Sequence, residues 1–470
     1  MTRAQKISIP FIVILLSMVI VHSASSQPGP AGRWDGAITL PGTDLGITVQ
    51  LNASGDSLQG TIDIPQQMAK GLRLNNVGVA GPMVHFTLHA GPAPAYFVGT
   101  LAADSISGIF TQGNLRCPFI LRRAAALPVA AAPPYRTEEV HIPSGAAVLA
   151  GTLSLPAGPG PHPAVVLLTG SGAQDRNEEI FGFAPFKILA DSLTLAGFAV
   201  LRCDDRGIGG STGRYAEATT DTFAADARAF VDLLKSRADI RRDAIGVLGH
   251  SEGGVATVML CSASHDIAFA ILLAGPAVGG DAIILGQIER LARASGATDS
   301  TIAVAKAAQN RVYDAVRANS GWDALRVQLL SDMKKSIAGM TAEQRSAAGI
   351  TDSVLSVRVD AQMATIRLPW FRRFVTYDPG PDISKISFPV LAIYGSLDMQ
   401  VPEAQNRPAL ASIVAKNHMT NVEIRTVEGA NHLFQLAKTG QPSEYATLAK
   451  SFVPGMPAMI GSWISRIVLH

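Results

Sequence analysis

The sequence is poor in cysteine and nearly balanced in charge. It has three cysteines, Cys117, Cys203 and Cys261, so at most one internal disulfide could form, and a disulfide-rich scaffold is excluded. We expect Cys203 and Cys261 to be buried small side chains rather than reactive thiols. No cysteine–histidine spacing and no His-Glu-x-x-His pattern occurs, so we expect no metal and no cofactor. With 39 basic and 37 acidic residues, the chain lacks the basic excess typical of nucleic-acid binding.

Long apolar runs are also scarce, and the run at 7–21 is shorter than the ~20 residues that a membrane span needs. It follows Arg3 and Lys6 and precedes small residues that end at Ser26, which is the pattern of a cleavable signal peptide at 1–26. An uncleaved anchor is the alternative. Cleavage near Ser26 removes two bases and no acid, so 39 and 37 become 37 and 37. We therefore expect a secreted or periplasmic protein, without a nucleic-acid partner or a stable membrane association.

The most informative motif is Gly-x-Ser-x-Gly, with Ser251 at its centre. An apolar run at 244–247 precedes it, and a small, apolar stretch at 255–261 follows. Strand, tight turn and helix form the context of a nucleophile elbow, in which the serine backbone is strained and flanking glycines remove collisions. Because the chain has 44 glycines, a chance match is the alternative, and partner residues must decide.

Two partner residues occur in the order that this arrangement requires, serine, acid and then histidine. Asp398 comes shortly after the apolar run 388–394, and His432 follows the alternating segment 422–427. Groups beyond the carboxyl ends of parallel strands converge on one crevice. His432 can take the serine proton, and Asp398 would hold the imidazole in the required tautomer. We therefore predict a triad with Ser251, although a turn-forming aspartate and an ordinary loop histidine are the separate alternatives.

The tetrahedral intermediate needs N–H donors aimed at its oxyanion. One donor is expected from the backbone of Glu252, directly after the nucleophile, and the other from the loop after a strand at 164–169. In that loop we expect Ser171 to donate, with Gly172 as the fallback. The carboxylate of Glu252 would lie in a partly dry cleft, so we expect a basic group to neutralise it, with Arg206 as the candidate.

The chain divides into parts of different pattern. Short alternating segments and turn residues at 32–123 predict an antiparallel β barrel or sandwich, and the Ala- and Pro-rich run 124–134 predicts a semi-rigid linker. Beyond it, alternating strands and helices predict an α/β fold with a doubly wound, mostly parallel sheet, formed by 135–280 and 368–470. The intervening 281–367 is longer than a crossover helix needs, and its apolar periodicity predicts an inserted helical cap.

A cap of this kind would exclude water and shape the acyl pocket. Trp370, Phe371 and Phe374, where the chain returns from the cap, and Gly172 are candidates for the lining of the substrate cleft. Packing between cap and core is the alternative for the three aromatic residues. The glycine-rich segment 204–213 lacks the lysine of a phosphate-binding loop, so we interpret it as a tight loop bracing the pocket, with phosphate binding as the alternative.

Together with the triad, three blocks of the α/β part resemble the α/β-hydrolase superfamily, and most closely secreted bacterial serine esterases related to the serine aminopeptidase group. These blocks are residues 169–178, 201–207 and 431–435. The stretches 33–36 and 117–121 resemble a lipocalin-like domain that precedes such esterases. Binding of a lipid or carbohydrate and a structural or dimerising role are its two alternatives, so homo-oligomers could form through this domain.

We therefore expect a serine carboxylic ester hydrolase that works through an acyl-enzyme on small-molecule esters, acyl or carbohydrate-linked. A serine aminopeptidase or acyltransferase on the same scaffold is the alternative with the same chemistry. The alternative from another class is a non-catalytic ligand-binding protein. Loss of ester turnover in a Ser251→Ala variant that still folds would separate the enzyme from the binder.

Overall fold

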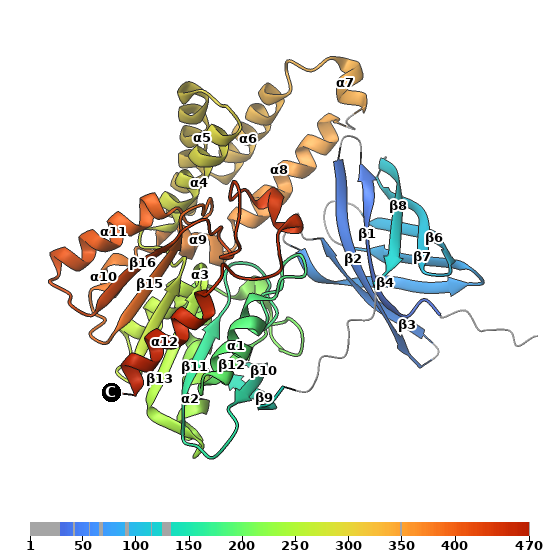
Figure 1. Ribbon diagram of the computed structural model, residues 1–470. Coiled ribbons are helices and arrows are strands. Elements are labelled where there is room, and N and C mark those ends of the chain that lie inside the picture. The colour runs from blue at the N-terminus through green and yellow to red at the C-terminus, as the bar shows by residue number, and fades with distance from the viewer. Residues whose placement is uncertain are drawn as a thin grey trace, which may run out of the picture.

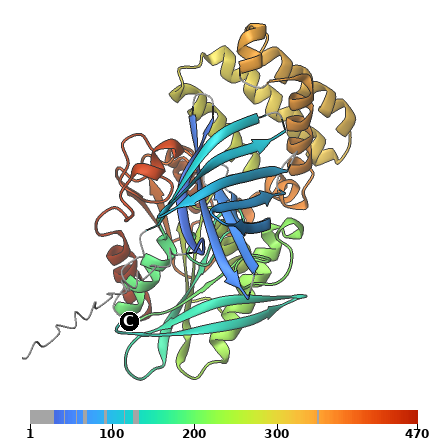
Figure 2. The same ribbon diagram turned by 90° about the vertical axis from the view of Figure 1, so that its right-hand side faces the viewer.

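The computed structural model describes residues 29–40, 43–55, 57–64, 69–89, 94–113, 115–124, 133–347 and 350–469. The predicted signal peptide at 1–26 and most of the predicted linker at 124–134 lie outside these described residues. Figure 1 shows a β barrel beside a larger part in which helices surround a second sheet. In Figure 2 the barrel faces the viewer.

Eight antiparallel strands close the first part into a barrel, in which β8 pairs back onto β1. The strands are β1 (Gly32–Leu40), β2 (Thr43–Ser54), β3 (Ser57–Ile64), β4 (Ala69–Ala80), β5 (Met83–Leu88), β6 (Ala95–Ala102), β7 (Ser105–Gln112) and β8 (Leu115–Arg123). The predicted barrel or sandwich is thus a closed barrel.

Aromatic side chains fill the barrel interior. Trp34 is fully buried, and the rings of Phe86 and Phe97 stack with centroids 4.7 Å apart. Phe119 meets the Phe97 ring edge-on at 5.4 Å. Small barrels bury alternate residues in this way to form a packed core. The packing favours the structural role of this domain over the ligand-binding one.

The second part is built on a sheet in the order β16-β15-β14-β13-β11-β12-β10-β9. Its pairs are parallel from β12 to β16, while β9 and β10 add an antiparallel edge. The strands are β9 (Arg136–Ser144), β10 (Ala147–Leu155), β11 (His162–Leu168), β12 (Ala199–Cys203), β13 (Ile240–His250), β14 (Phe269–Leu273), β15 (Val390–Gly395) and β16 (Val422–Val427).

Helices cover both faces of this sheet, as a buried parallel sheet requires. One group comprises α1 (Pro185–Leu195) and α12 (Met456–Val468), which contact each other. The other comprises α2 (Thr220–Ser236), α3 (Glu252–Ser262), α10 (Gly380–Ile383) and α11 (Glu403–Lys416). The predicted doubly wound, mostly parallel α/β sheet is confirmed.

Between β14 and β15 a group of helices stands over one end of the sheet (Figure 1). They are α4 (Gly280–Ala294), α5 (Asp299–Ala318), α6 (Trp322–Ser336), α7 (Ala342–Ala347) and α8 (Asp352–Ile366), followed by α9 (Pro369–Thr376). All of these helices except α7 contribute to a hydrophobic cluster of their own, in which Tyr313 and Val359 are fully buried. No helix in the described ranges is both long and apolar enough to cross a membrane.

Candidate active site

Ser251 lies alone in the tight turn between β13 and α3. Its backbone has φ +53° and ψ −118°, the left-handed region that non-glycine residues seldom adopt. A Cβ at Gly249 would lie 2.1 Å from the carbonyl oxygen of Gly253, and one at Gly253 would lie 2.2 Å from that of Leu168. The two glycines of the motif are therefore required by the close approach of strand and helix.

Asp398 and His432 lie in loops that follow β15 and β16. His432 Nδ1 is 2.8 Å from Asp398 Oδ2, and both side chains are buried. The backbone N–H groups of Gln400 and Val401 donate to the other carboxylate oxygen of Asp398, at 2.7 and 2.9 Å. These bonds fix the carboxylate, which in turn fixes the orientation of the imidazole.

The nucleophile turn and the His432 loop are in direct contact. The ring centroids of His250 and His432 are 4.7 Å apart, and His250 Nε2 is 2.9 Å from the carbonyl oxygen of His432. Within the part of the chain that is described, neither His432 Nε2 nor Ser251 Oγ has a hydrogen-bond partner. Catalytic hydrogen bonds are often long before substrate binds. The structure thus brings the three predicted triad residues to one edge of the sheet without a bond between serine and histidine.

The loop after β11 presents three successive backbone N–H groups. Gly170 donates to Glu178 Oε1 at 2.7 Å, and Gly172 donates to the Tyr215 hydroxyl at 3.0 Å. The N–H of Ser171 has no acceptor among the described residues. A side chain on Gly170 would place its Cβ 3.2 Å from the Cβ of Ser251, so this loop lies directly against the turn between β13 and α3.

The Glu252 side chain is buried and held by neutral donors. Its Oε1 accepts from Thr220 Oγ1 at 2.7 Å and from Trp370 Nε1 at 2.6 Å, and burial raises the pKa of the carboxyl. The expectation that Arg206 neutralises this group is wrong. Arg206 donates instead to Asp226, with Nε 2.7 Å from Oδ2. The backbone N–H of Glu252, at the start of α3, has no acceptor in the described ranges.

The aromatic residues at the return from the cap have different surroundings. Trp370 is half-buried, donates to Glu252 and stacks on Phe374, with centroids 5.5 Å apart. Phe371 is buried among the cap helices, in the cluster that contains Tyr313. That Trp370 and Phe374 line the substrate cleft remains a prediction. Phe371 is surrounded by helices, as expected if it serves packing and does not line the cleft.

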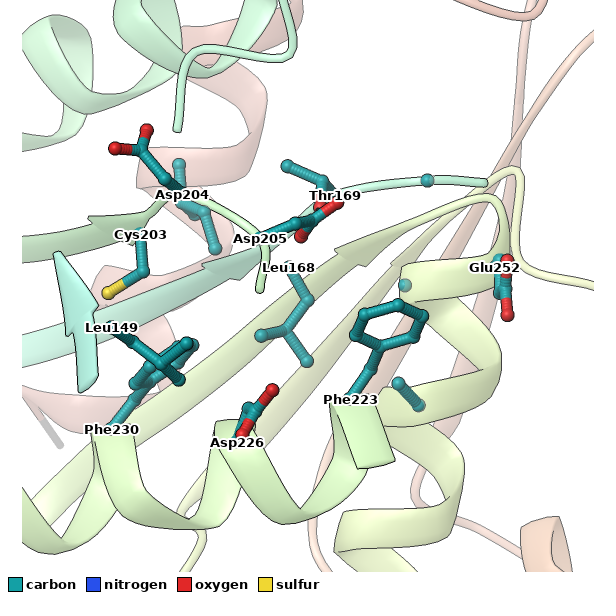
Figure 3. Close-up of a pocket in the computed structure, with 14 residues that line it drawn as sticks. Leu149, Leu168, Thr169, Cys203, Asp204, Asp205, Phe223, Asp226, Phe230 and Glu252 are labelled. Carbon is teal, nitrogen blue, oxygen red and sulfur yellow. The ribbon is translucent and has the colours of Figure 1, made fainter. Parts of the chain in front are cut away.

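A small internal cavity lies behind the loop that contains Gly170 (Figure 3). Leu168 and Phe223 contribute apolar surface, and Asp205 and Glu252 contribute carboxyl groups. Burial raises the pKa of Asp205 well above its usual value, and the nearby Glu252 raises it further. The cavity is therefore an acidic, largely enclosed space under the site.

The glycine-rich segment 204–213 is tied down by its first residue. Asp204 accepts from the Arg176 guanidinium at 2.8 Å and from the backbone N–H of Gly210 at 3.0 Å. A carboxylate thus occupies the centre of this loop, where a phosphate-binding loop would present N–H groups to an anion. These contacts agree with the interpretation of segment 204–213 as a tight loop that braces the pocket.

Sequence reasoning missed Glu178 and His250. Glu178 Oε1 lies 2.7 Å from His250 Nδ1, so a second histidine–carboxylate pair adjoins the first. His250 lies within the serine motif, and Glu178 lies within the block 169–178. Their positions were visible in the sequence, but no local pattern showed that they meet.

Known proteins were compared with the whole chain. Residues 183–436 match the family model described as Hydrolase_4, serine aminopeptidase S33. Esterase EstD of Thermotoga maritima is 25% identical over 285 residues, 61% of this chain and 58% of that protein. A 2,6-dihydropseudooxynicotine hydrolase of Paenarthrobacter nicotinovorans is 40% identical over 101 residues, 21% of this chain and 24% of that protein. The chain thus spans less than two thirds of the length of either curated relative.

Among solved structures, the Pyrococcus furiosus esterase Pf2001 is 15% identical, with a TM-score of 0.41, over 73% of this chain and 96% of that one. The family model covers more than half of the chain, from the end of the loop after β11 to the loop after β16. The chain therefore belongs to the serine aminopeptidase S33 family of α/β hydrolases.

Proposed function

We propose that the protein is a serine carboxylic ester hydrolase acting on small-molecule esters, acyl or carbohydrate-linked. The observation that carries the proposal is the 2.8 Å contact between His432 Nδ1 and a fully buried Asp398, beside a serine in a strained elbow. The base thus has a fixed ring and a second nitrogen without a hydrogen-bond partner among the described residues, as proton transfer requires. The similarity to an esterase supports the ester bond as the substrate class.

The proposed reaction has two matching halves. Ser251 Oγ attacks the ester carbonyl while its proton passes to His432 Nε2, and Asp398 stabilises the imidazolium. The C–O bond to the alcohol then breaks, and the alcohol leaves with the proton from His432. Water attacks the acyl-enzyme by the same route and releases the acid and the free serine.

Two backbone N–H groups would receive the negative oxygen of each tetrahedral intermediate. The N–H groups of Ser171 and Glu252 support this role because neither has an acceptor among the described residues. Gly172, the fallback donor, already donates to Tyr215. Ser171 is therefore the stronger assignment.

The proposal is tested by Ser251→Ala in the full-length protein, with p-nitrophenyl esters of graded acyl length. We expect kcat to fall by roughly 10⁶ with the fold retained. Ser262→Ala, at the other end of α3, is the matched control and should keep the parent rate, because Ser262 Oγ bonds to the Met259 carbonyl and the Asp382 carboxylate and to no predicted triad residue among those described. Parent-like turnover by Ser251→Ala would overturn the assignment. Aminoacyl p-nitroanilides assayed in parallel compare amide with ester cleavage, the comparison that the family's description calls for.

A further inference from the structure

His250 and Glu178 form a buried pair that the proposed reaction does not use. Both side chains are nearly inaccessible, at 5% and 2% exposure. His250 Nδ1 is 2.7 Å from Glu178 Oε1, and its Nε2 is 2.9 Å from the carbonyl oxygen of His432. Glu178 itself has φ +51°, a conformation that non-glycine residues seldom adopt. Such outliers persist where the surrounding structure holds them, and they cluster at functional sites.

The partners of His250 fix its charge. A carbonyl oxygen can only accept, so His250 Nε2 carries a proton. Glu178 Oε1 also accepts the N–H of Gly170 at 2.7 Å, so this oxygen offers lone pairs to both neighbours. This arrangement suits an imidazolium facing a carboxylate, with the second proton on His250 Nδ1.

The electrostatic surroundings agree with this charge state. Burial lowers the pKa of His250, but the charge of Glu178 and the two hydrogen bonds outweigh it, so the pKa is raised. The other titratable groups that face the pair are His432, Asp398 and, on the Glu178 side, Asp205. A buried ion pair costs desolvation, so it is weak evidence of added stability, and what this pair contributes beside Ser251 is its contacts with the two neighbouring loops.

We propose that the Glu178–His250 ion pair positions two loops around Ser251. One is the loop at 170–172, called here the oxyanion loop because it contains Ser171, and the other is the loop that contains His432. Glu178 holds the oxyanion loop through the N–H of Gly170, next to Ser171. His250 holds the other loop through the carbonyl oxygen of His432. Because His250 directly precedes Ser251, these contacts connect the oxyanion loop, the turn that contains Ser251 and the loop that contains His432. The inference rests on the proposed function of Ser251 and His432.

The charge state is tested without any assay of activity. Full-length protein labelled with ¹⁵N-histidine should show both ring nitrogens of His250 protonated at pH 7, with the signals assigned by their loss in His250→Gln. Glu178→Gln should convert His250 to a neutral tautomer. A neutral His250 in the parent protein at pH 7 would overturn the ion pair. This measurement stands even if Ser251 proves not to be the nucleophile, so the two proposals fail separately.

The positioning role is tested by kinetics on the same esters. Glu178→Gln keeps an oxygen for Gly170 but loses the charge, and we expect kcat to fall roughly 10- to 100-fold with KM nearly unchanged. Glu178→Ala loses both contacts and should fall further. Asp239→Asn breaks the ion pair with Arg237 directly before β13, at the opposite end of that strand from Ser251, and is the matched control. It should lower stability and leave kcat at the parent value.

The pH profile separates positioning from simple loss of structure. In the parent, the positioning contact is charged only while His250 keeps its second proton, so kcat should fall on the alkaline side as pH rises through the raised pKa of His250. Glu178→Gln lacks the charge at every pH, so this alkaline fall should be absent from it and present in Asp239→Asn. A loss of activity in Glu178→Gln that matches only its unfolded fraction, with an unchanged profile, would reduce the pair to a structural contact and overturn the proposal.

Discussion

Two histidine–carboxylate pairs lie beside each other at this edge of the sheet. In each, a buried carboxylate oxygen is within 2.8 Å of the histidine Nδ1. They differ at the other ring nitrogen. His250 Nε2 faces a carbonyl oxygen at 2.9 Å, whereas His432 Nε2 has no partner in the part of the chain that is described.

The difference teaches which features make a histidine a base. The carboxylate orients the ring in both pairs, so it does not distinguish their roles. A histidine whose second nitrogen is bonded to a carbonyl cannot take up another proton, and it serves as a charged link. A histidine whose second nitrogen is unoccupied can exchange a proton with a serine.

The largest expected effect comes from removing each histidine in turn. His432→Gln should lower kcat by roughly 10⁴ to 10⁶, because the base itself is lost. His250→Gln should cost roughly 10- to 100-fold, because only positioning is lost. Pre-steady-state ester hydrolysis measures both. Equal losses in the two variants would mean that the pairs do not have separate roles.

A smaller difference is expected when only the acid of the catalytic pair is neutralised. Asp398→Asn retains the shape but favours the wrong imidazole tautomer, so kcat should fall by roughly 10⁴. The steady-state rate on a p-nitrophenyl ester checks this, with circular dichroism to confirm the fold. A fall of only tenfold, like that expected for Glu178→Gln, would make Asp398 a positioning residue of the same kind.

Glu252 is a third buried carboxyl at the site. Its hydrogen-bond donors are neutral side chains, whereas Asp398 and Glu178 each face a histidine. Trp370→Phe keeps an aromatic ring on Phe374 but removes the N–H that bonds Glu252. Glu252 Oε1 keeps its bond from Thr220, so we expect the free energy of unfolding to fall by about 0.5–1.5 kcal/mol, the net contribution of one hydrogen bond. Urea denaturation measures it, and Trp322→Phe on the cap is the control. Equal small losses in both variants would show that the indole bond contributes nothing.

The smallest effect is a change in the pH dependence of stability. Because burial raises the pKa of Glu252, the folded protein favours its neutral form, and ionisation destabilises the fold as pH rises from 4.5 through the raised pKa. Glu252→Gln cannot ionise, so its melting temperature relative to the parent should increase from pH 5 to pH 8. His250 has the same sign, because its raised pKa gives stability that is present below 6.5 and is lost as pH rises through that pKa. The deficit of Glu178→Gln should therefore also shrink as pH rises, but only above 6.5, whereas the change in Glu252→Gln begins at 4.5. Differences from the parent that do not change with pH would contradict both assignments.

The sequence carries much of the proposed site because the determinants of that site are local. The glycines around Ser251 and the positions of Asp398 and His432 just after strand-like runs needed no knowledge of the fold. Barrel closure was left open, because it depends on the pairing of β1 with β8, which are far apart in the chain.

The partners of buried charges could not be predicted. Arg206 was expected beside Glu252, yet it pairs with Asp226 on α2 and with the Ser144 carbonyl. Long-range packing decides which charged side chains pair inside a protein, so local sequence patterns do not predict the pairs. The meeting of Glu178 with its histidine escaped prediction for the same reason.

In the loop at 170–172, the amides on either side of Ser171 are already bonded, to Glu178 and to the Tyr215 hydroxyl. Their bonds fix the planes of the neighbouring peptides and so restrict rotation of the middle amide. In the proposed reaction, a charge that develops there would meet a dipole that is already oriented, and no existing contact would have to break. The loop is therefore already ordered in the folded protein, and substrate binding does not have to reorganise it.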